Sequence, residues 1–235
     1  MAVAATERSG LREGPAGLWR FKGWGPSWVT AGVIGPPAER SQLTAHLPTL
    51  RDVVQAEQVH GSSIAVIHQA REITHPVAGC DALLTSVPGM GLVIRTADCL
   101  PIFLLDPSRR AVAIAHVGWR GLAAGLPLRL VTAFRHLVHS RPEALRVAIG
   151  PAIRSCCYEV GPEFERRFGS FVQVRQGQRT CDLIGVAVEQ LRRGGVAATR
   201  ILDSRQCTRC SPSPWYSIRR DGQETGRLLS FIAIR

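Results

Sequence analysis

Short apolar runs bounded by turn residues are the sequence feature that most restricts how this chain can fold. Beyond residue 51 such runs recur at 64–67, 91–95, 102–105 and 111–117. They are short and rich in β-branched residues, and Gly, Pro or Asp bounds them, which favours strands over helices. Their nearly continuous apolar character predicts strands buried on both faces, as in a sheet covered by other layers.

Helical spacing follows these runs. Apolar residues between 121 and 138 recur as on one face of a helix, and Pro127 predicts a kink or a late start for it. The same analysis predicts further helices at 161–168 and 181–193 and further strands at 145–149, 171–175, 215–219 and 228–234. Residues 1–50 are rich in Gly and Pro and weakly patterned. The chain is therefore expected to mix helices and strands.

Composition and length set mild limits. A chain of 235 residues suits one large domain or two small ones. No apolar run is long enough to cross a bilayer. Glu7 and Glu13 lie where a signal peptide would need an apolar segment. These observations predict a cytoplasmic protein with no membrane partner.

The net charge of +11 raises the possibility of a nucleic-acid partner. Lys22 is the only lysine, and the arginines are spread along the chain without a dense block. This distribution favours a solvated basic surface and no specific nucleic-acid partner. Some of the arginines are candidates for binding an anionic substrate or phosphate.

The seven cysteines, an odd number, do not indicate a disulfide framework. Cys80, Cys181 and the adjacent pair at 156–157 are interpreted as small buried hydrophobic residues. Cys207 and Cys210 have the two-residue gap of a metal or redox pair, but the sequence shows no second pair to complete a zinc knuckle.

Two histidines and one cysteine form a candidate metal-binding set: His60, Cys99 and His116. Two imidazoles and one thiolate suit zinc or a similar borderline-soft ion, and three protein ligands leave one position open for chemistry. Gly61 after His60 marks a turn where the backbone can approach a site. His116 lies at the end of a predicted buried strand. The alternative for Cys99, which precedes Pro101, is an inert buried thiol.

Several motifs in the same order resemble the laccase-like multicopper polyphenol oxidase family, whose members are also described as purine nucleoside phosphorylases and as peptidoglycan editing factors. The resemblance covers roughly residues 51–235. It rests on Thr96–Pro101, His116–Gly121 and the segments 81–85, 88–89, 150–151, 157–161, 217–222 and 225–227. Residues 1–50 lack the Arg-Gly-Gly and Ser-Leu-Asn stretches of the family and form a divergent N-terminal part.

The resemblance implies an α/β (α+β) fold, with residues 1–235 as a single-domain layered sandwich of mixed β-sheets flanked by helices, often described as four-layer. It also implies that His60, Cys99 and His116 hold the metal, Zn²⁺ with Cu²⁺ as an alternative. The implied activity is phosphorolysis of adenosine, inosine and methylthioadenosine, with adenosine deaminase activity. The small-molecule substrates are then a purine nucleoside and phosphate.

Phosphate binding is assigned first to Arg120, whose guanidinium can bind two oxygens at a predicted helix start, and second to Arg220. The structural alternative pairs Arg120 with Asp98 or Asp221. The charged segment 219–222 has the composition of a hairpin turn.

Other residues around the expected metal have candidate roles. In a strand, Gln58 would share a face with His60 and contact substrate. Asp98 could orient a metal-bound histidine. Trp119 and Tyr158 are expected either to stack on a purine or to lie in the core.

Three alternative functions remain. Cys99 could be the nucleophile of a hydrolase acting on a cell-wall (peptidoglycan) precursor, with His60 or His116 as the base. A copper-loaded centre would instead oxidise polyphenols. A basic nucleic-acid-binding protein without catalysis is a third possibility, and the sequence does not indicate an oligomeric state.

Overall fold

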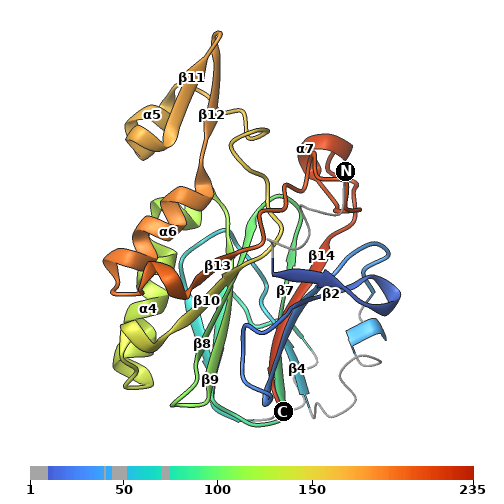
Figure 1. Cartoon of the computed structure of the whole chain (residues 1–235), viewed down its shortest axis with the longest axis vertical. Coiled ribbons are helices and arrows are strands. Elements are labelled where there is room, and N and C mark those ends of the chain that lie inside the picture. Colours follow the sequence, from blue (N-terminus) through green and yellow to red (C-terminus); the bar gives the residue numbers. More distant parts are fainter. Residues whose placement is uncertain (1–9, 40, 44–51, 70–74) are drawn as a thin grey trace.

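Two six-stranded mixed sheets pack face to face, and helices cover the outer face of one of them (Figure 1). The computed structural model describes residues 10–39, 41–43, 52–69 and 75–235. In spatial order the first sheet contains β1 (Leu11–Glu13), β2 (Leu18–Phe21), β3 (Val29–Ile34), β14 (Leu228–Ile234), β7 (Met90–Thr96) and β4 (Asp52–Gln55). Its neighbours are antiparallel except for the parallel pair β4 and β7.

The second sheet carries parallel pairs at both of its edges and antiparallel pairs between them. In spatial order it contains β13 (Ile201–Asp203), β10 (Arg146–Ile149), β8 (Leu100–Asp106), β9 (Ala111–Val117), β6 (Ala82–Thr85) and β5 (Ile64–Ile67). A separate hairpin, β11 (Val172–Arg175) with β12 (Gln178–Cys181), projects from one end of the molecule (Figure 1).

The helices that the structure describes from end to end are α3 (Trp119–Ala123), α4 (Leu126–Leu137), α5 (Glu163–Phe168), α6 (Leu183–Arg193) and α7 (Ile218–Asp221). Single 3-10 turns lie at Pro15–Gly17, Pro142–Ala144, Gly169–Phe171 and Ala198–Arg200. No helix among the described residues is both long and apolar enough to span a membrane.

Strand β8 shows why both faces of the second sheet are apolar. Ile102 and Leu104 pack into the core formed with α4 and α6, whereas Phe103 and Leu105 pack into the core between the two sheets. Because side chains alternate along a strand, a central strand with two covered faces needs apolar residues at every position. The prediction of a layered α+β sandwich is confirmed. A smaller cluster that includes Leu43 lies on the outer face of the first sheet.

Three predictions from the sequence are corrected. The helix expected at 121–138 is two helices, because Gly125 adopts φ 74°; the late start predicted from Pro127 is confirmed, since Pro127 lies in the first turn of α4. The strand expected at 215–219 is wrong. There the side chain of Ser217 accepts a hydrogen bond from the Arg220 amide and caps α7, so 219–222 is not a hairpin turn either.

The third correction concerns the N-terminal part. The weakly patterned segment before residue 35 supplies three strands of the first sheet. Residues 1–9, 40 and 44–50 of the same part lie outside the described residues.

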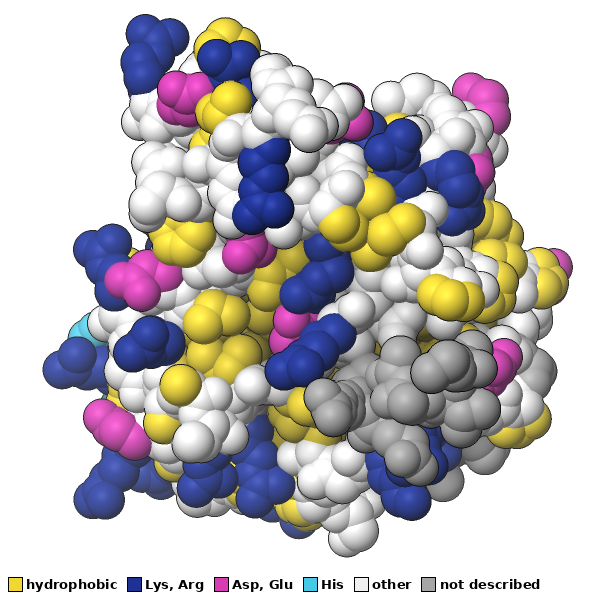
Figure 2. All heavy atoms as spheres, turned by 45° about the horizontal axis from the view of Figure 1, so that its top comes forward, with side chains coloured by type: hydrophobic (Ala, Val, Ile, Leu, Met, Phe, Trp, Pro, Cys, Tyr) yellow, Lys and Arg dark blue, Asp and Glu magenta, His cyan; other side chains and the backbone are white. Residues whose placement is uncertain are grey.

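Charged side chains are dispersed over the face of the molecule in Figure 2. Figure 2 shows Lys and Arg side chains scattered over one face, with acidic and hydrophobic side chains between them. On this face the charge does not form one continuous basic stripe.

Candidate metal centre

The fold brings His60, Cys99 and His116 together from three separate segments. The ligand atoms of these side chains all lie within 4.8 Å of one another. His60 is exposed, Cys99 is partly buried and His116 is buried. The centre therefore opens to solvent on the His60 side.

Each residue is positioned by its place in the sheets. His60 lies in the loop between β4 and β5, where its φ of 59° turns the chain sharply. Cys99 lies in the short connection from β7 to β8, and His116 is in β9. Because β4 and β7 belong to one sheet and β5, β8 and β9 to the other, the centre lies where the chain passes between the two sheets.

Asp81 holds the centre in place. This fully buried carboxylate accepts a hydrogen bond from Nδ1 of His116 at 2.8 Å. It also accepts the backbone amides of Val59, His60 and Gly61 at 3.2, 3.0 and 2.6 Å. Since Nδ1 of His116 is engaged, Nε2 is the nitrogen left for a ligand, which is the arrangement that carboxylates impose on metal-binding histidines.

The electrostatics favour a thiolate at Cys99. Burial alone would raise the pKa of this thiol, but hydrogen bonds with His116 and His60 and their positive charges lower it to about 7. Burial opposes the charged form of His116 as well, yet Asp81 and Cys99 raise its pKa to about 9. The pKa of Asp81 is lowered, because His116 and the amides of the His60 loop outweigh its burial.

This donor set fits a zinc-type ion. Zinc binds thiolate sulfur and imidazole nitrogen, and catalytic sites combine three protein ligands with one open position. The group comprises three ligand residues among those the structure describes. A carboxylate fixes one imidazole, and the lowered pKa of Cys99, about 7, makes its thiolate readily available at neutral pH.

A cavity of about 700 Å³ opens beside the centre. Its wall includes His60, Cys99 and His116 together with Gln58 and two arginines, Arg95 and Arg227. This volume is within the range of small-molecule sites, about 300–1,000 Å³.

A second cavity, of about 230 Å³, lies against the same centre. It shares His60 and Cys99 with the first and adds Trp119, Tyr158 and Arg120. The candidate ligands thus lie between a polar cavity and one with two aromatic side chains.

The predicted phosphate-binding residues differ in position. Arg120 lines the smaller cavity, where its guanidinium lies 4.5 Å from the centroid of the Trp119 ring. No ion pair joins it to Asp98 or Asp221 in the part of the chain that the structure describes. Arg220 instead forms a bidentate ion pair with Asp221 and donates to backbone carbonyls, including that of Trp215.

Gln58 lines the larger cavity, but not as a strand residue. Its φ is 63°, and its side-chain amide exchanges two hydrogen bonds with the backbone of Arg95, at 2.6 and 2.7 Å. This pairing fixes the loop that carries His60 against β7. Gln58 keeps one N–H for the cavity, since its amide nitrogen has two.

The expected role of Asp98 is wrong. Its carboxylate accepts hydrogen bonds from Thr208 Oγ1 at 2.6 Å and from the Arg219 amide at 2.8 Å, away from both histidines. Asp81 is the acceptor for His116. The sequence did carry a signal for Asp81, since it is an acidic residue at the start of an apolar run. A carboxylate that enters the core needs hydrogen-bond partners.

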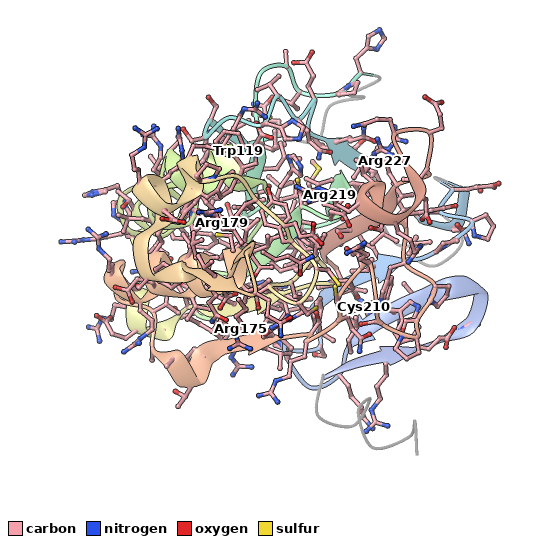
Figure 3. All side chains as sticks on the ribbon, turned by 90° about the horizontal axis from the view of Figure 1, so that it is seen from above. Trp119, Arg175, Arg179, Cys210, Arg219 and Arg227 are labelled. Carbon is pink, nitrogen blue, oxygen red and sulfur yellow. The ribbon has the colours of Figure 1, made fainter. Side chains whose placement is uncertain are left out.

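Two more arginines escaped the sequence analysis. Arg95 is exposed at the end of β7, and its side chain lines the larger cavity. Arg227 lines the same cavity and braces the preceding loop by donating to the carbonyls of Thr225 and Gly226. Figure 3 shows Trp119, Arg219 and Arg227 along the same end of the molecule.

These features define a sandwich of two mixed sheets with a two-histidine, one-cysteine centre at their junction. The family model described as multi-copper polyphenol oxidoreductase laccase matches residues 37–235, and the chain belongs to this family.

Several relatives of the chain are named as purine-nucleoside enzymes. It is 35% identical over 197 residues to purine nucleoside phosphorylase YlmD of Geobacillus stearothermophilus, covering 77% of this chain and 72% of the relative. It is 36% identical over 208 residues to a purine nucleoside phosphorylase of Deinococcus radiodurans, covering 85% of this chain and 78% of the relative. The chain is also 32% identical to adenosine deaminase RL5 from an unknown prokaryotic organism. That match covers 78% of this chain and 75% of the relative.

The fold agrees with a solved structure of the family. The crystal structure of YlmD from Geobacillus stearothermophilus superposes with a TM-score of 0.85 at 29% identity. The match covers 96% of this chain and 98% of the other. It therefore includes most of the segment before residue 37.

Proposed function

We propose that this chain is a zinc-dependent purine nucleoside phosphorylase that acts on adenosine, inosine and methylthioadenosine and also deaminates adenosine. The observation that carries the proposal is the convergence of His60, Cys99 and His116 within 4.8 Å between two cavities. The relatives named for these two activities support it. His60, Cys99 and His116 would hold the ion, which supplies Lewis acidity at this point when bound.

Phosphorolysis breaks the bond between the purine nitrogen and ribose C1′ and forms a C1′–O bond to phosphate. The chain must hold phosphate in line with that bond and stabilise the charge on the departing base. Arg120 and Arg95 are the arginines we assign to phosphate, because each lines one of the cavities and their guanidinium groups can bind two oxygens. Arg220 would instead act indirectly, because its hydrogen bonds to the carbonyls of Thr208 and Trp215 hold the loop between them in place.

The nucleoside has matching partners. Tyr158 and Trp119 border the smaller cavity, where an aromatic ring can stack on a purine. The remaining N–H of Gln58 faces the larger cavity and can donate to a polar group of the substrate. Adenosine deamination requires the same placement, with water replacing the amino group at C6 and ammonia leaving.

The test is nucleoside turnover by metal-free and metal-loaded protein. We expect zinc-loaded protein to convert inosine to hypoxanthine only when phosphate is present, and adenosine to inosine without phosphate. His116→Ala should abolish both reactions. Turnover of neither nucleoside by the zinc-loaded wild-type chain would overturn the proposal.

A second function is favoured by one observation, the chain Cys99–His116–Asp81. A thiol with a pKa of about 7, an imidazole and a buried carboxylate also form the set used by cysteine hydrolases. Such an enzyme would keep its activity on a peptidoglycan precursor after chelation and would lose it on alkylation of Cys99. Activity that chelation removes and zinc restores would favour the first function. Activity on polyphenols only after copper loading would instead identify an oxidase.

A further inference from the structure

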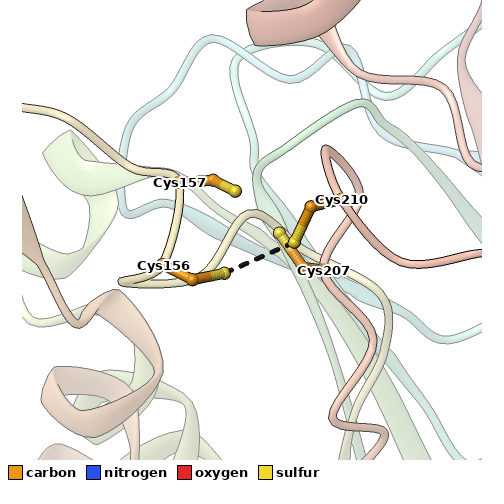
Figure 4. A group of neighbouring side chains, drawn as sticks. All are labelled: Cys156, Cys157, Cys207 and Cys210. Atoms are coloured by element: carbon orange, nitrogen blue, oxygen red, sulfur yellow. Dashed lines mark hydrogen bonds between the residues drawn. The ribbon is translucent and has the colours of Figure 1, made fainter.

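Four cysteines meet outside the centre described above. Their sulfur atoms all lie within 4.8 Å of one another, and the residues are Cys156, Cys157, Cys207 and Cys210 (Figure 4). The sequence analysis interpreted 156–157 as buried hydrophobic residues and found no second pair for Cys207 and Cys210. The first interpretation is confirmed for Cys157, which is buried, and wrong for Cys156, which is exposed. The second is corrected, because the fold places the two pairs together.

We propose that these four cysteines, the four-cysteine cluster, bind a structural zinc ion separate from the histidine-containing centre. Four thiolates in a tetrahedron are a standard closed zinc site, and a Zn–S distance of about 2.3 Å places the sulfur atoms about 3.8 Å apart. The Cys156 and Cys210 sulfur atoms are 3.6 Å apart. The remaining separations need to contract by no more than about 1 Å.

Both turns that present the sulfur atoms are built into the fold. A bridge between Ala152 and Cys207 joins them, and the Thr208 amide donates to the Ala152 carbonyl at 3.1 Å. The turn of Cys207 closes on Ser211, whose side chain accepts the Cys207 amide at 2.7 Å. The guanidinium of Arg220 donates to the Thr208 carbonyl at 3.0 Å. These hydrogen bonds therefore hold the backbone of both turns that carry the sulfur atoms.

Amide and cationic groups near the cluster stabilise negative charge on part of it. Although burial opposes the thiolate of Cys207, backbone amides of Cys210, Arg154 and Arg209 lower its pKa. The guanidinium of Arg154 is held by Asp203 at 2.7 Å and interacts electrostatically with Cys156. Cationic and amide groups therefore offset part of the charge that four thiolates would carry.

Without a cation, Cys157 stays protonated at neutral pH. Burial and the neighbouring Cys210 and Cys207 raise the pKa of its thiol to about 11, although a hydrogen bond with Cys156 lowers it in part. Zinc binding would release the thiol protons to solvent, so its affinity should rise with pH.

The ion would stabilise one wall of the histidine-containing centre. Thr208, inside the Cys207 turn, donates to the Asp98 carboxylate, and the Ile153 amide donates to the Asp98 carbonyl at 2.9 Å. Asp98 is the residue before Cys99. Tyr158, which follows Cys157, lines the smaller cavity. Zinc at the four-cysteine cluster would thus fix the backbone around a proposed catalytic ligand.

The test begins with full-length His60→Ala/His116→Ala protein, purified reduced and metal-free, which lacks two ligands of the other centre. Titration with Co²⁺ should reach one equivalent and produce the thiolate-to-cobalt charge-transfer and tetrahedral d–d absorption of a four-sulfur complex, and Zn²⁺ should displace it. Absence of these bands would overturn the proposal. This readout does not depend on nucleoside turnover, so the two proposals can fail separately.

Wild-type protein provides a second measurement that does not require a variant to fold. Zinc should protect all four cysteines of the cluster from iodoacetamide, with the modified positions mapped by mass spectrometry. Equal alkylation with and without zinc, or a Cys156–Cys210 disulfide in the reduced preparation, would overturn the site. Cys210→Ser should bind one zinc ion where the wild-type chain binds two. Cys181→Ala is the matched control and should bind two.

Discussion

Among single residues, Asp81 gives the most direct test of the metal centre, because it fixes both His116 and the backbone of the His60 loop. We expect Asp81→Asn to lower zinc affinity about 10–100-fold, since the amide no longer sets the orientation and basicity of the imidazole. Competition against a chromophoric chelator measures the affinity. Asp106→Asn, another buried Asp but at the turn between β8 and β9, is the control and should leave it unchanged.

Gly118 tests how closely the ligands pack. A Cβ at this position would lie 3.1 Å from the Cys99 sulfur and 3.4 Å from Cδ2 of His60. The φ of −85° is open to any residue, so Gly118→Ala should fold but displace the ligands. We expect zinc affinity to fall about tenfold, because overpacking costs of order 1–3 kcal/mol.

The matched control for this substitution is Gly35→Ala. A Cβ there meets its nearest neighbours only at 3.7 Å, an ordinary contact distance. Equal zinc affinities for the two alanine variants, measured by the same chelator competition, would contradict the packing argument.

Some of the residues at the metal centre could be predicted from the sequence, and others could not. His60, Cys99 and His116 could be singled out because their types and flanking glycines indicate ligand chemistry, and the fold brings them together. Asp81 was missed because nothing local reveals that it reaches β9 across the sheet. Asp98 adjoins Cys99 in sequence, but its φ of 85° and its bonds to Thr208 turn it away.

At the level of elements, the turn between β8 and β9 is closed by Asp106. Its buried carboxylate accepts hydrogen bonds from the Ser108 amide, the Ser108 hydroxyl and the Arg109 amide at 2.8, 2.7 and 3.1 Å. Burial would raise the pKa of Asp106, but these bonds lower it below its ordinary value. The group therefore contributes stability that is present above its unfolded pKa and is lost as the pH falls through the folded one.

Asp106→Asn should consequently cost about 1–3 kcal/mol at pH 7, because charge-assisted bonds are replaced by neutral ones. The difference from wild type should shrink as the pH falls below about 4. Urea unfolding at several pH values measures it. A difference that stayed constant across this range would show that the charge of Asp106 does not contribute.

Strands were predicted correctly where the sequence carries a single clear pattern of apolar residues. Strands β5, β7, β8 and β9 were found because they are apolar and bounded by turn residues. The segment 215–219 failed because the Ser217 side chain caps a helical turn whose Arg219 amide is held by Asp98, a residue distant in sequence. The strands before residue 35 were missed because their Gly- and Pro-rich sequence has little periodicity, and pairing with β14 organises them.

At the scale of the whole molecule, the distribution of the arginines is relevant to the kind of partner that the chain can bind. The charge of +11 is distributed among acidic and apolar side chains on the face in Figure 2, and several arginines are held in ion pairs, such as Arg154 with Asp203 and Arg179 with Glu165. High-affinity duplex binding requires many phosphate contacts made at once. The face in Figure 2 shows no continuous row of cationic side chains for such contacts.

The position of the proposed metal ligands between the two sheets leads to a prediction about global stability. A ligand that binds only the folded chain at about 100 times its Kd adds about 2.7 kcal/mol. For a chain of this size that raises Tm by about 5–11 °C. We propose that residues 1–235 form one domain, and we therefore expect a single calorimetric transition that moves upward with zinc concentration.

The two proposed sites can be separated in this experiment. His60→Ala/His116→Ala should retain only the shift due to the four-cysteine cluster, and Cys210→Ser only that due to the histidine-containing centre. Because the first centre takes its ligands from segments that join both sheets, its ion should shift the whole transition. Two transitions, only one of which responds to zinc in Cys210→Ser, would show that the sheets unfold independently and that the centre does not couple them.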